Sequence, residues 1–370
     1  GSDSSLFSGN GDDIRAADWT ADRNPAVNHE TKSFSLNINH ELSDTMTLTS
    51  LTSYTSFTDD NSQYERGGFS GVTAGFVRNL VNDSPTSPFD SGSDYEDFLQ
   101  GEYASYSDDQ YVSSDYVFQN GTIDSVSQEL RITQVLDDVV WIGGLYYSAS
   151  EVDYDTLQDF GTSTNANLFK HPTLGEVLGF NYLRNVVNQE STTYAAFLNA
   201  DWTISDQLTV TTGIRYTDDT SDYTGCSHNV DGAMTAFMGA FFGINVPANT
   251  CLTVIDFPGP NARGANAEKQ LAEDSVSWRL AANYELDRDT SVYASYSRGF
   301  KAGSFPSLGA ITVDQLDPVV QEQLDAYEVG FKITLDEGAA RLNGSAFYYD
   351  YKDKQLLTKK NNIYKINHFL

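Results

Sequence analysis

Strict alternation of apolar and polar side chains over residues 276–286 constrains the fold more than any other feature of the sequence. One side of an extended chain here would carry Val276, Trp278, Leu280, Ala282, Tyr284 and Leu286. The other side would carry Ser277, Arg279, Ala281, Asn283 and Glu285. Because the side chains of a strand point to opposite faces in turn, this segment is predicted to be a β-strand with one apolar and one polar face.

The same unit recurs along most of the chain. Short polar turns are predicted at 43–44, 137–138, 205–206, 287–289 and 336–338, each between two alternating segments. This gives five hairpins, or about ten strands within residues 31–356. Long loops are predicted at about 59–122, 156–189, 224–272 and 301–323.

Short turns at one end and long loops at the other are typical of outer-membrane barrels. We therefore predict an all-β fold: an antiparallel up-and-down transmembrane β-barrel segment with short periplasmic turns and long extracellular loops. No run of about 18 apolar residues is present, so transmembrane helices are excluded, whereas barrel strands are only half apolar. The alternative is a large soluble antiparallel β protein with one buried face.

Charge and motif content exclude several function classes. The chain of 370 residues carries 52 acidic and 22 basic side chains, a net charge of −30, which argues against a nucleic-acid partner. No catalytic motif is present, and the five histidines lack the spacing of metal ligands. We predict neither an enzyme nor a cofactor nor a metal site, and we interpret the acidic clusters as a solvated surface.

Four stretches together identify a family resemblance. The segment YASYSRGFKAG at 293–303 resembles the signature of the β-barrel of TonB-dependent outer-membrane receptors, and 127–132, 193–216 and 324–355 fit the same pattern in order. The resemblance implies a 22-stranded barrel with an N-terminal plug domain inside it. No plug-like segment is evident, so residues 1–370 are interpreted as a partial barrel domain, a fragment from the middle. The lysine-rich end is either an off-frame tail or a genuine terminal strand.

The resemblance also implies roles for individual residues. In the family, wall glutamates pair with arginines of the plug, and Glu129 and Glu328 match these motif positions. We name Glu129, Arg131 and Glu328 as candidates for plug contact; the alternative is that they pair within the wall, with Arg131 or Lys332. The motif segment comprises Arg298, Gly299, Phe300, Lys301 and Gly303, whose two glycines are expected to shape the exit of the strand.

Other charged side chains on the polar face are predicted to point into the lumen, where water or protein surrounds them. These are Arg215, Arg279 and Lys332. On the lipid face a charge would cost about 2–4 kcal/mol at mid-membrane. Trp202 and Tyr284 lie near short turns and are expected in the periplasmic aromatic girdle.

Cys226 and Cys251 are the two cysteines of the chain, and they bracket a loop rich in Gly, Ala and Phe. An oxidising exterior favours a disulfide between them, although two unpaired thiols remain the alternative.

The function that the resemblance implies is energised uptake of a scarce, bulky solute, such as an iron–siderophore complex, across the outer membrane of a Gram-negative bacterium. The implied partners are outer-membrane lipid, the protein's own plug, the TonB–ExbB–ExbD complex acting through the missing N-terminal part, and a small-molecule ligand. Two other classes stay open: a passive porin or structural barrel, and a secreted adhesin-like β protein.

Overall fold

The computed structural model describes residues 26–65, 116–159, 182–307, 309–335, 338–360 and 363–369. Three predicted loops lie wholly or largely outside these residues: the N-terminal loop up to residue 25, and the loops 59–122 and 156–189. Within the described part, no helix combines the length and the apolar character that a helical membrane crossing needs.

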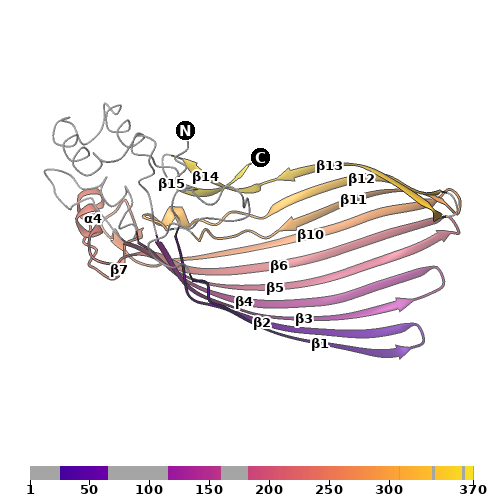
Figure 1. The fold of residues 1–370 in the computed structure, drawn as a ribbon, viewed down its shortest axis with the longest axis horizontal. Helices are drawn as coiled ribbons and strands as arrows, with labels where there is room; N and C mark the ends of the chain where they lie inside the picture. The colour runs from indigo at the N-terminus through magenta and orange to yellow at the C-terminus, as the bar shows by residue number, and fades with distance from the viewer. Residues whose placement is uncertain are drawn as a thin grey trace, which may run out of the picture.

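Ten long strands form one antiparallel sheet in which each strand pairs with its neighbour in the chain, in agreement with the predicted up-and-down fold (Figure 1). The strands are β1 (His29–Ser43), β2 (Met46–Glu65), β3 (Tyr116–Val135), β4 (Val139–Asp159), β5 (Tyr182–Ser205), β6 (Leu208–Asn229), β10 (Ala267–Glu285), β11 (Thr290–Lys301), β12 (Glu322–Leu335) and β13 (Ala340–Lys352). The hairpin turns gather at one end of the sheet, and the long connections gather at the other (Figure 1).

Several strands extend further toward the loops than predicted, and the loops beside them are correspondingly shorter. β5 has 24 residues, and β6 continues to Asn229, inside the predicted loop 224–272. The predicted limits were wrong because apolar and polar side chains no longer alternate in the outer parts of these strands, such as 182–190 of β5, while the backbone keeps its ladder of hydrogen bonds. At about 3.3 Å per residue, β5 is too long for the membrane alone and must project beyond it.

The connection between β6 and β10 is also more regular than a plain loop. It contains α4 (Met234–Phe242), β7 (Thr250–Cys251), β8 (Val254–Ile255) and β9 (Arg263–Gly264), and β7 pairs with the end of β6. The connection between β11 and β12 contains the short 3-10 helix η3 (Val313–Leu316). Beyond β13, the chain forms a separate hairpin, β14 (Lys354–Lys360) and β15 (Ile363–Phe369).

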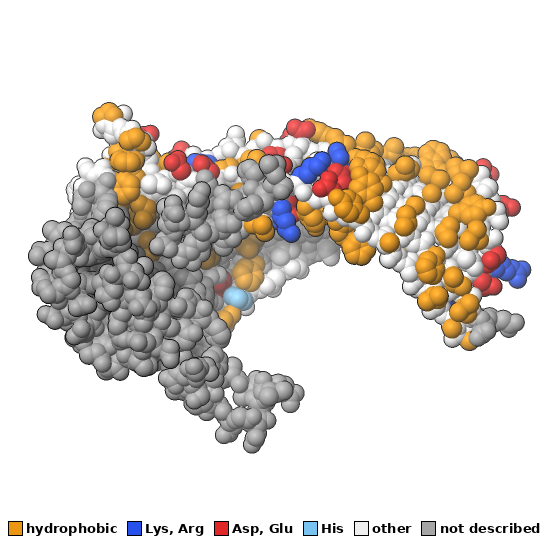
Figure 2. Space-filling view, turned by 90° about the horizontal axis from the view of Figure 1, so that it is seen from above, with side chains coloured by type: hydrophobic (Ala, Val, Ile, Leu, Met, Phe, Trp, Pro, Cys, Tyr) orange, Lys and Arg blue, Asp and Glu red, His pale blue; other side chains and the backbone are white. Residues whose placement is uncertain are grey.

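Strand register fixes which side chains share a face. Leu280 of β10 lies opposite Tyr296 of β11, and Ala282 lies opposite Ala294. The apolar series of every strand therefore forms one continuous face, on which Leu280 is 51% exposed and Leu198 is 49% exposed. Exposed apolar side chains on this scale are what a membrane-facing surface requires, and Figure 2 shows hydrophobic side chains gathered over the strand region with charged groups at its borders.

The opposite face is covered near the loop end. Val187, Tyr223 and Ala267 belong to this second face and are buried against Phe305 and Leu316 of the β11–β12 connection. A second apolar cluster lies within the β6–β10 connection, where Met234 and Met238 of α4 pack with Ile244, Val246, Leu252 and Val254. The buried core thus lies largely in the extracellular loop assembly, because the strands offer one face to lipid and the other to the lumen.

Candidate lumenal binding surface

The second face carries the charged side chains that the sequence assigned to the lumen. On β3, Arg131 Nη1 lies 3.4 Å from Glu129 Oε1, and both side chains are partly exposed. The Nε atom of Arg131 is buried without a hydrogen-bond partner among the described residues. The two plug-contact candidates of β3 therefore form one ion pair on the wall, with donor capacity left over on the arginine.

Arg215 of β6 lies among aromatic rings of the same face. Its guanidinium carbon is 5.2 Å from the ring centroid of Tyr146 and 5.9 Å from that of Phe197, and its Nε donates to Thr217 Oγ1 at 3.1 Å. Aromatic faces attract a cation at such distances. The side chain is thereby held against the wall of the lumen.

A third polar group lies across β11 and β12. The hydroxyl of Tyr293 donates to Glu328 Oε1 at 2.6 Å, and Lys332 Nζ lies 5.8 Å from the centre of the Tyr293 ring. The ring lies over Gly330, where an added Cβ atom would come within 2.6 Å of it. A side chain at 330 would therefore have to displace the Tyr293 ring from its place across the neighbouring strand.

These groups do not converge on one point. The Glu129–Arg131 pair is on β3, whereas Glu328 is on β12 near the other edge of the sheet. Arg279 of β10 is exposed on the same face between them. The described part of this surface is therefore a wall lined with separated charges and aromatic rings.

Two loop segments close over the lumenal face at the extracellular end. Phe305 stacks on Tyr223 with ring centroids 4.8 Å apart, and Lys269 Nζ lies 2.6 Å from Asp317 Oδ1. The two connections also bond to each other, because Val254 N donates to Ile311 O at 2.7 Å and Thr253 Oγ1 donates to Ala310 O at 2.8 Å. The β6–β10 and β11–β12 connections thus form one packed assembly at the loop end of the sheet, and we call this assembly the mouth.

The cysteines lie within this assembly. Cys226 and Cys251 form a disulfide that joins the end of β6 to β7, with an S–S distance of 2.09 Å. His228 lies beside the disulfide, with Nε2 3.9 Å from Cys251 Sγ. Among the described residues, the side chains of Cys226, His228 and Cys251 lie close enough together to be considered as metal ligands. Burial and the nearby charge of Arg184 hold the pKa of His228 below its ordinary value, against the opposing effect of Asp155. With both sulfur atoms bonded to each other, the group contains no free thiolate for a metal.

The family-motif segment is strand rather than loop up to Lys301, which corrects the predicted exit at Gly299. Phe300 lies opposite Gln323 of β12, and Lys301 lies opposite Glu322, so the ladder continues through the motif. The exit comes at Gly303, whose N–H donates to Glu273 Oε2 at 2.9 Å. An added Cβ atom there would come within 2.4 Å of Val319 O. The glycine is required because the departing backbone passes so close to its neighbours.

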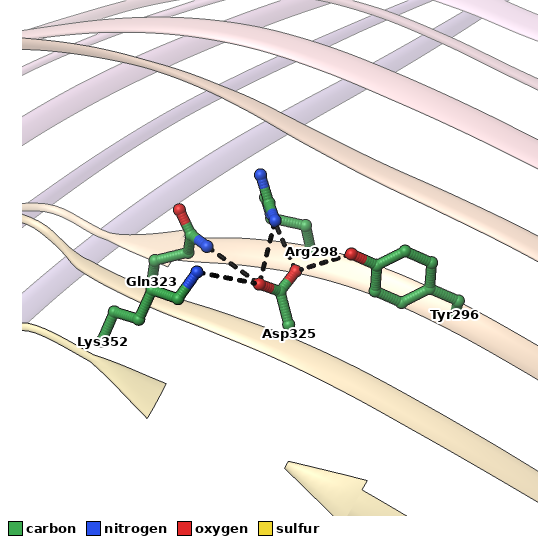
Figure 3. Close-up of polar contacts among 5 residues, drawn as sticks. All are labelled: Tyr296, Arg298, Gln323, Asp325 and Lys352. Atoms are coloured by element: carbon green, nitrogen blue, oxygen red, sulfur yellow. Dashed lines mark hydrogen bonds and ion pairs between the residues drawn. The ribbon is translucent and has the colours of Figure 1, made fainter. Parts of the chain in front are cut away.

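Arg298 of the motif belongs to the membrane-facing series, where it surrounds a carboxylate together with three neighbours (Figure 3). Its Nε and Nη2 atoms donate to the two oxygens of Asp325 at 2.8 and 2.9 Å. Tyr296 donates to Asp325 at 3.0 Å, Gln323 donates at 2.9 Å, and Lys352 Nζ lies 3.9 Å away. Asp325 is only 3% exposed. This bidentate network ties β11, β12 and β13 together just below the strand exit.

The sequence did not predict roles for Asp325 or for the lumenal aromatic residues Tyr146, Phe197 and Tyr293. The alternation of β11 already places Tyr293 on the face of Ser291 and Ser295, so its orientation could have been found. The pairing of Arg298 with Asp325 depends on the register between β11 and β12. A long connection separates these strands, so the local sequence pattern does not predict their register.

Comparison with known proteins agrees with this geometry. The family model described as "TonB dependent receptor-like, beta-barrel" matches residues 1–366. The ferric yersiniabactin uptake receptor FyuA from Yersinia pestis is similar in fold, with a TM-score of 0.57 and 17% identity over 90% of this chain and 37% of that one. The siderophore receptor PiuA from Acinetobacter baumannii has a TM-score of 0.55 and 10% identity over 91% of this chain and 42% of that one.

A copper transporter, OprC, has a TM-score of 0.52 and 12% identity over 92% of this chain and 42% of that one. The chain thus spans about two fifths of the length of these structures. No match was found among curated proteins. With its alternating faces, its lumenal charges and its folded mouth, the chain belongs to the family of TonB-dependent receptor β-barrels.

Proposed function

We propose that this chain forms part of the wall and mouth of an outer-membrane receptor that takes up a scarce, bulky solute by TonB-energised transport. The observation that carries the proposal is the lumenal face, where separated charges and aromatic rings lie below a mouth of packed loops. Such a wall can bind and guide a large solute along its separated groups. An iron–siderophore complex is the solute class we propose, supported by the solutes named for FyuA and PiuA.

In this proposal the charged wall groups contact a plug domain inside the barrel. Glu328 accepts a hydrogen bond from the Tyr293 hydroxyl at 2.6 Å, and Arg131 keeps donors beyond its bond to Glu129. A plug that carries opposite charges would pair with both strands at once. Removal of the charges should loosen the plug without unfolding the barrel.

The proposed experiment measures uptake of radioactive iron by cells that produce the full-length receptor. Ferric complexes of catecholate, hydroxamate and phenolate siderophores would be offered one at a time, with and without a protonophore, and a copper salt would be included because of OprC. We expect saturable uptake of one complex that stops when the proton-motive force is removed. Uptake that is linear in concentration and insensitive to the protonophore would instead identify a passive pore.

The plug contacts need their own variants. Glu328→Gln and Glu129→Gln should alter energised uptake, whereas Glu285→Gln, close to the periplasmic turn, provides the matched control. If the two wall variants transport at the unaltered rate and leave antibiotic leakage unchanged, the glutamates only stabilise the wall.

A further inference from the structure

Two arginine side chains lie close together on the lumenal face of β6 and β10, which are neighbouring strands of the sheet (Figure 1). Arg215 of β6 lies opposite Ser277 of β10, and Arg279 lies opposite Gly213, so the two arginines are diagonal neighbours across the strand pair. Diagonal positions are about 7–8 Å apart, which long side chains can span. Two like charges therefore share one part of the wall, and this arrangement costs free energy unless an opposite charge offsets them.

Neither arginine has a carboxylate partner among the described residues. Arg215 donates a hydrogen bond to Thr217 Oγ1 at 3.1 Å, whereas Arg279 is exposed and has no hydrogen bond or ion pair within that part of the chain. Four other arginines lie 2.5–3.4 Å from a carboxylate oxygen: Arg131, Arg184, Arg263 and Arg298. Since the chain has 52 acidic side chains, the lack of a carboxylate here is a property of this position.

The floor of the site is a glycine. Gly213 lies between Arg279 of β10 and Asn199 of β5, in one row across three strands. The side chain of Asn199 lies over the glycine, where an added Cβ atom would collide with it. Two guanidinium groups and one side-chain amide, all of them able to donate hydrogen bonds, thus surround Gly213.

These donors suit a carboxylate. A guanidinium group offers a planar pair of N–H donors that matches the two carboxylate oxygens, as Arg298 and Asp325 show elsewhere in this chain. Arg215 is held by its two aromatic neighbours and by Thr217, so its remaining donors are already oriented. A side chain that is ordered before the anion arrives loses little conformational entropy on binding.

The depth of the site indicates the source of the carboxylate. At 3.3 Å per residue, about 20 Å of strand separates Arg279 from Glu285 at the turn end of β10, and about 26 Å separates Arg215 from Tyr223 at the mouth. A membrane-spanning strand has about 9–11 residues, so the site faces the interior near mid-membrane. A solute occupies this depth only in passage, whereas an enclosed domain is present in every molecule and offsets the two charges permanently.

We propose that Arg215 and Arg279 form an anion-binding site that receives a carboxylate of the plug domain. The inference rests on the proposed function, because it needs a plug inside the barrel. It also gives the plug a charge pattern, in which an acidic group faces β6 and β10 and a basic group faces Glu328 of β12. The acidic contact is the reverse of the pairing that the family resemblance implies for the wall glutamates.

Zero-length cross-linking of the full-length receptor in membranes tests the site. Arg215→Lys and Arg279→Lys keep the charge and introduce an amine. A carbodiimide condenses this amine with a touching carboxylate to form an amide, and the carbodiimide takes up the released water to become a urea. We expect mass spectrometry to detect the introduced lysine linked to an acidic residue of the plug.

Lys269 and Asp317, whose Nζ and Oδ1 atoms lie 2.6 Å apart, provide an internal control for the cross-linking in every sample. Formation of the control link without a link to the plug would overturn the proposal. A link from the introduced lysine only to carboxylates of the wall, such as Glu129, would also overturn it.

Removal of the two charges gives a second measurement. The double variant Arg215→Gln, Arg279→Gln should speed amide hydrogen exchange of the plug about tenfold, the size expected for loss of a charge-assisted hydrogen bond. Arg288→Gln, at the exposed turn after β10, is the matched control and should leave this exchange unchanged. Heat-modifiable gel mobility shows that each barrel is folded. Unchanged plug exchange together with weaker binding of the ferric complex would assign the anion to the solute and overturn the plug assignment.

Iron uptake by the same cells separates this inference from the proposed function. A receptor that forms the plug link but shows no energised uptake retains the anion site and loses the proposed transport. A receptor that takes up iron in an energised manner but forms no plug link loses the anion site alone.

Discussion

At the scale of single residues, the Arg298–Asp325 network shows how a family motif can serve structure. A nearly buried carboxylate receives two bonds from one guanidinium and one from each of two neutral donors. We expect Arg298→Ala to lower the thermal stability of the extracellular half, because the carboxylate would lose its bidentate partner. Arg298→Lys should restore only part of the loss, since an ammonium cannot reproduce the planar fork.

Thermal unfolding followed by gel mobility measures this effect. Lys352→Met is the matched control, because Lys352 lies 3.9 Å from Asp325 and is half exposed. A lysine variant as stable as the original protein, or a control as damaging as Arg298→Ala, would show that the bidentate geometry has no special role.

His228 gives a pH dependence with a defined sign. Burial first, and the charge of Arg184 second, hold its pKa below the ordinary 6.5. The folded protein therefore releases this proton more readily than the unfolded chain does. Neutral His228 therefore contributes fully to the free energy of unfolding above pH 6.5, and this contribution is lost as the pH falls below that value. We expect the mouth to melt at a lower temperature at pH 5.5 than at pH 7.5.

The control for this prediction is His228→Gln, which cannot become charged. It should reduce the difference between the two pH values. An undiminished difference in the variant would assign the effect to other groups.

At the scale of elements, the mouth depends on the stacking of Phe305 on Tyr223. Phe305→Ala leaves a cavity in a buried cluster and should destabilise the β11–β12 connection by about 3 kcal/mol. Tyr223→Phe should be neutral or stabilising by up to about 1 kcal/mol, because the Tyr223 hydroxyl is buried without a hydrogen-bond partner among the described residues. The same burial raises the pKa of Tyr223 to about 12.

Hydrogen exchange of residues 302–321 distinguishes the two variants. The alanine variant should exchange faster by roughly two powers of ten, and the phenylalanine variant should not exchange faster at all. Fast exchange already in the unaltered protein would mean that the connection is not packed as described.

The disulfide is the second constraint on the mouth. Its two cysteines are separated by 25 residues in sequence. Closing a loop of this size stabilises the folded state by roughly 3 kcal/mol in the chain-entropy description. Mass spectrometry without a reductant should detect the two cysteine peptides linked, and Cys251→Ser should make the β6–β10 connection more sensitive to protease. Freely alkylated thiols in the unreduced protein would contradict the pairing.

Element order was predictable because each strand carries its own pattern. The alternation of 276–286 and the polar turns define strands and hairpins locally, and the structure places ten strands in one up-and-down sheet. Strand ends were not predictable, since β6 beyond Tyr223 is polar on both faces. α4 and the β7 pairing also escaped prediction, because they are stabilised by contacts between distant loops rather than by a periodic sequence.

At the scale of the whole molecule, one sheet separates two environments. The membrane-facing side carries exposed apolar side chains, and the other side carries charges and aromatic rings beneath the folded mouth. The packed core lies mainly in the loop connections, because their side chains can be buried against one another and need not face lipid or the lumen. This division is the reason that a chain with a mean hydropathy of −0.40 can cross a membrane.

The most direct test of this division is a cysteine scan of β10 from residue 276 to residue 284 in the full-length receptor in membranes. Cys226 and Cys251 would first be replaced by serine. Each introduced cysteine would then be treated with a charged maleimide that stays in water and with a lipid-soluble nitroxide. We expect labelling by the charged reagent at 277, 279, 281 and 283, and access of the nitroxide at 276, 278, 280, 282 and 284. Labelling by the charged reagent at every position, or a pattern without a period of two, would contradict it.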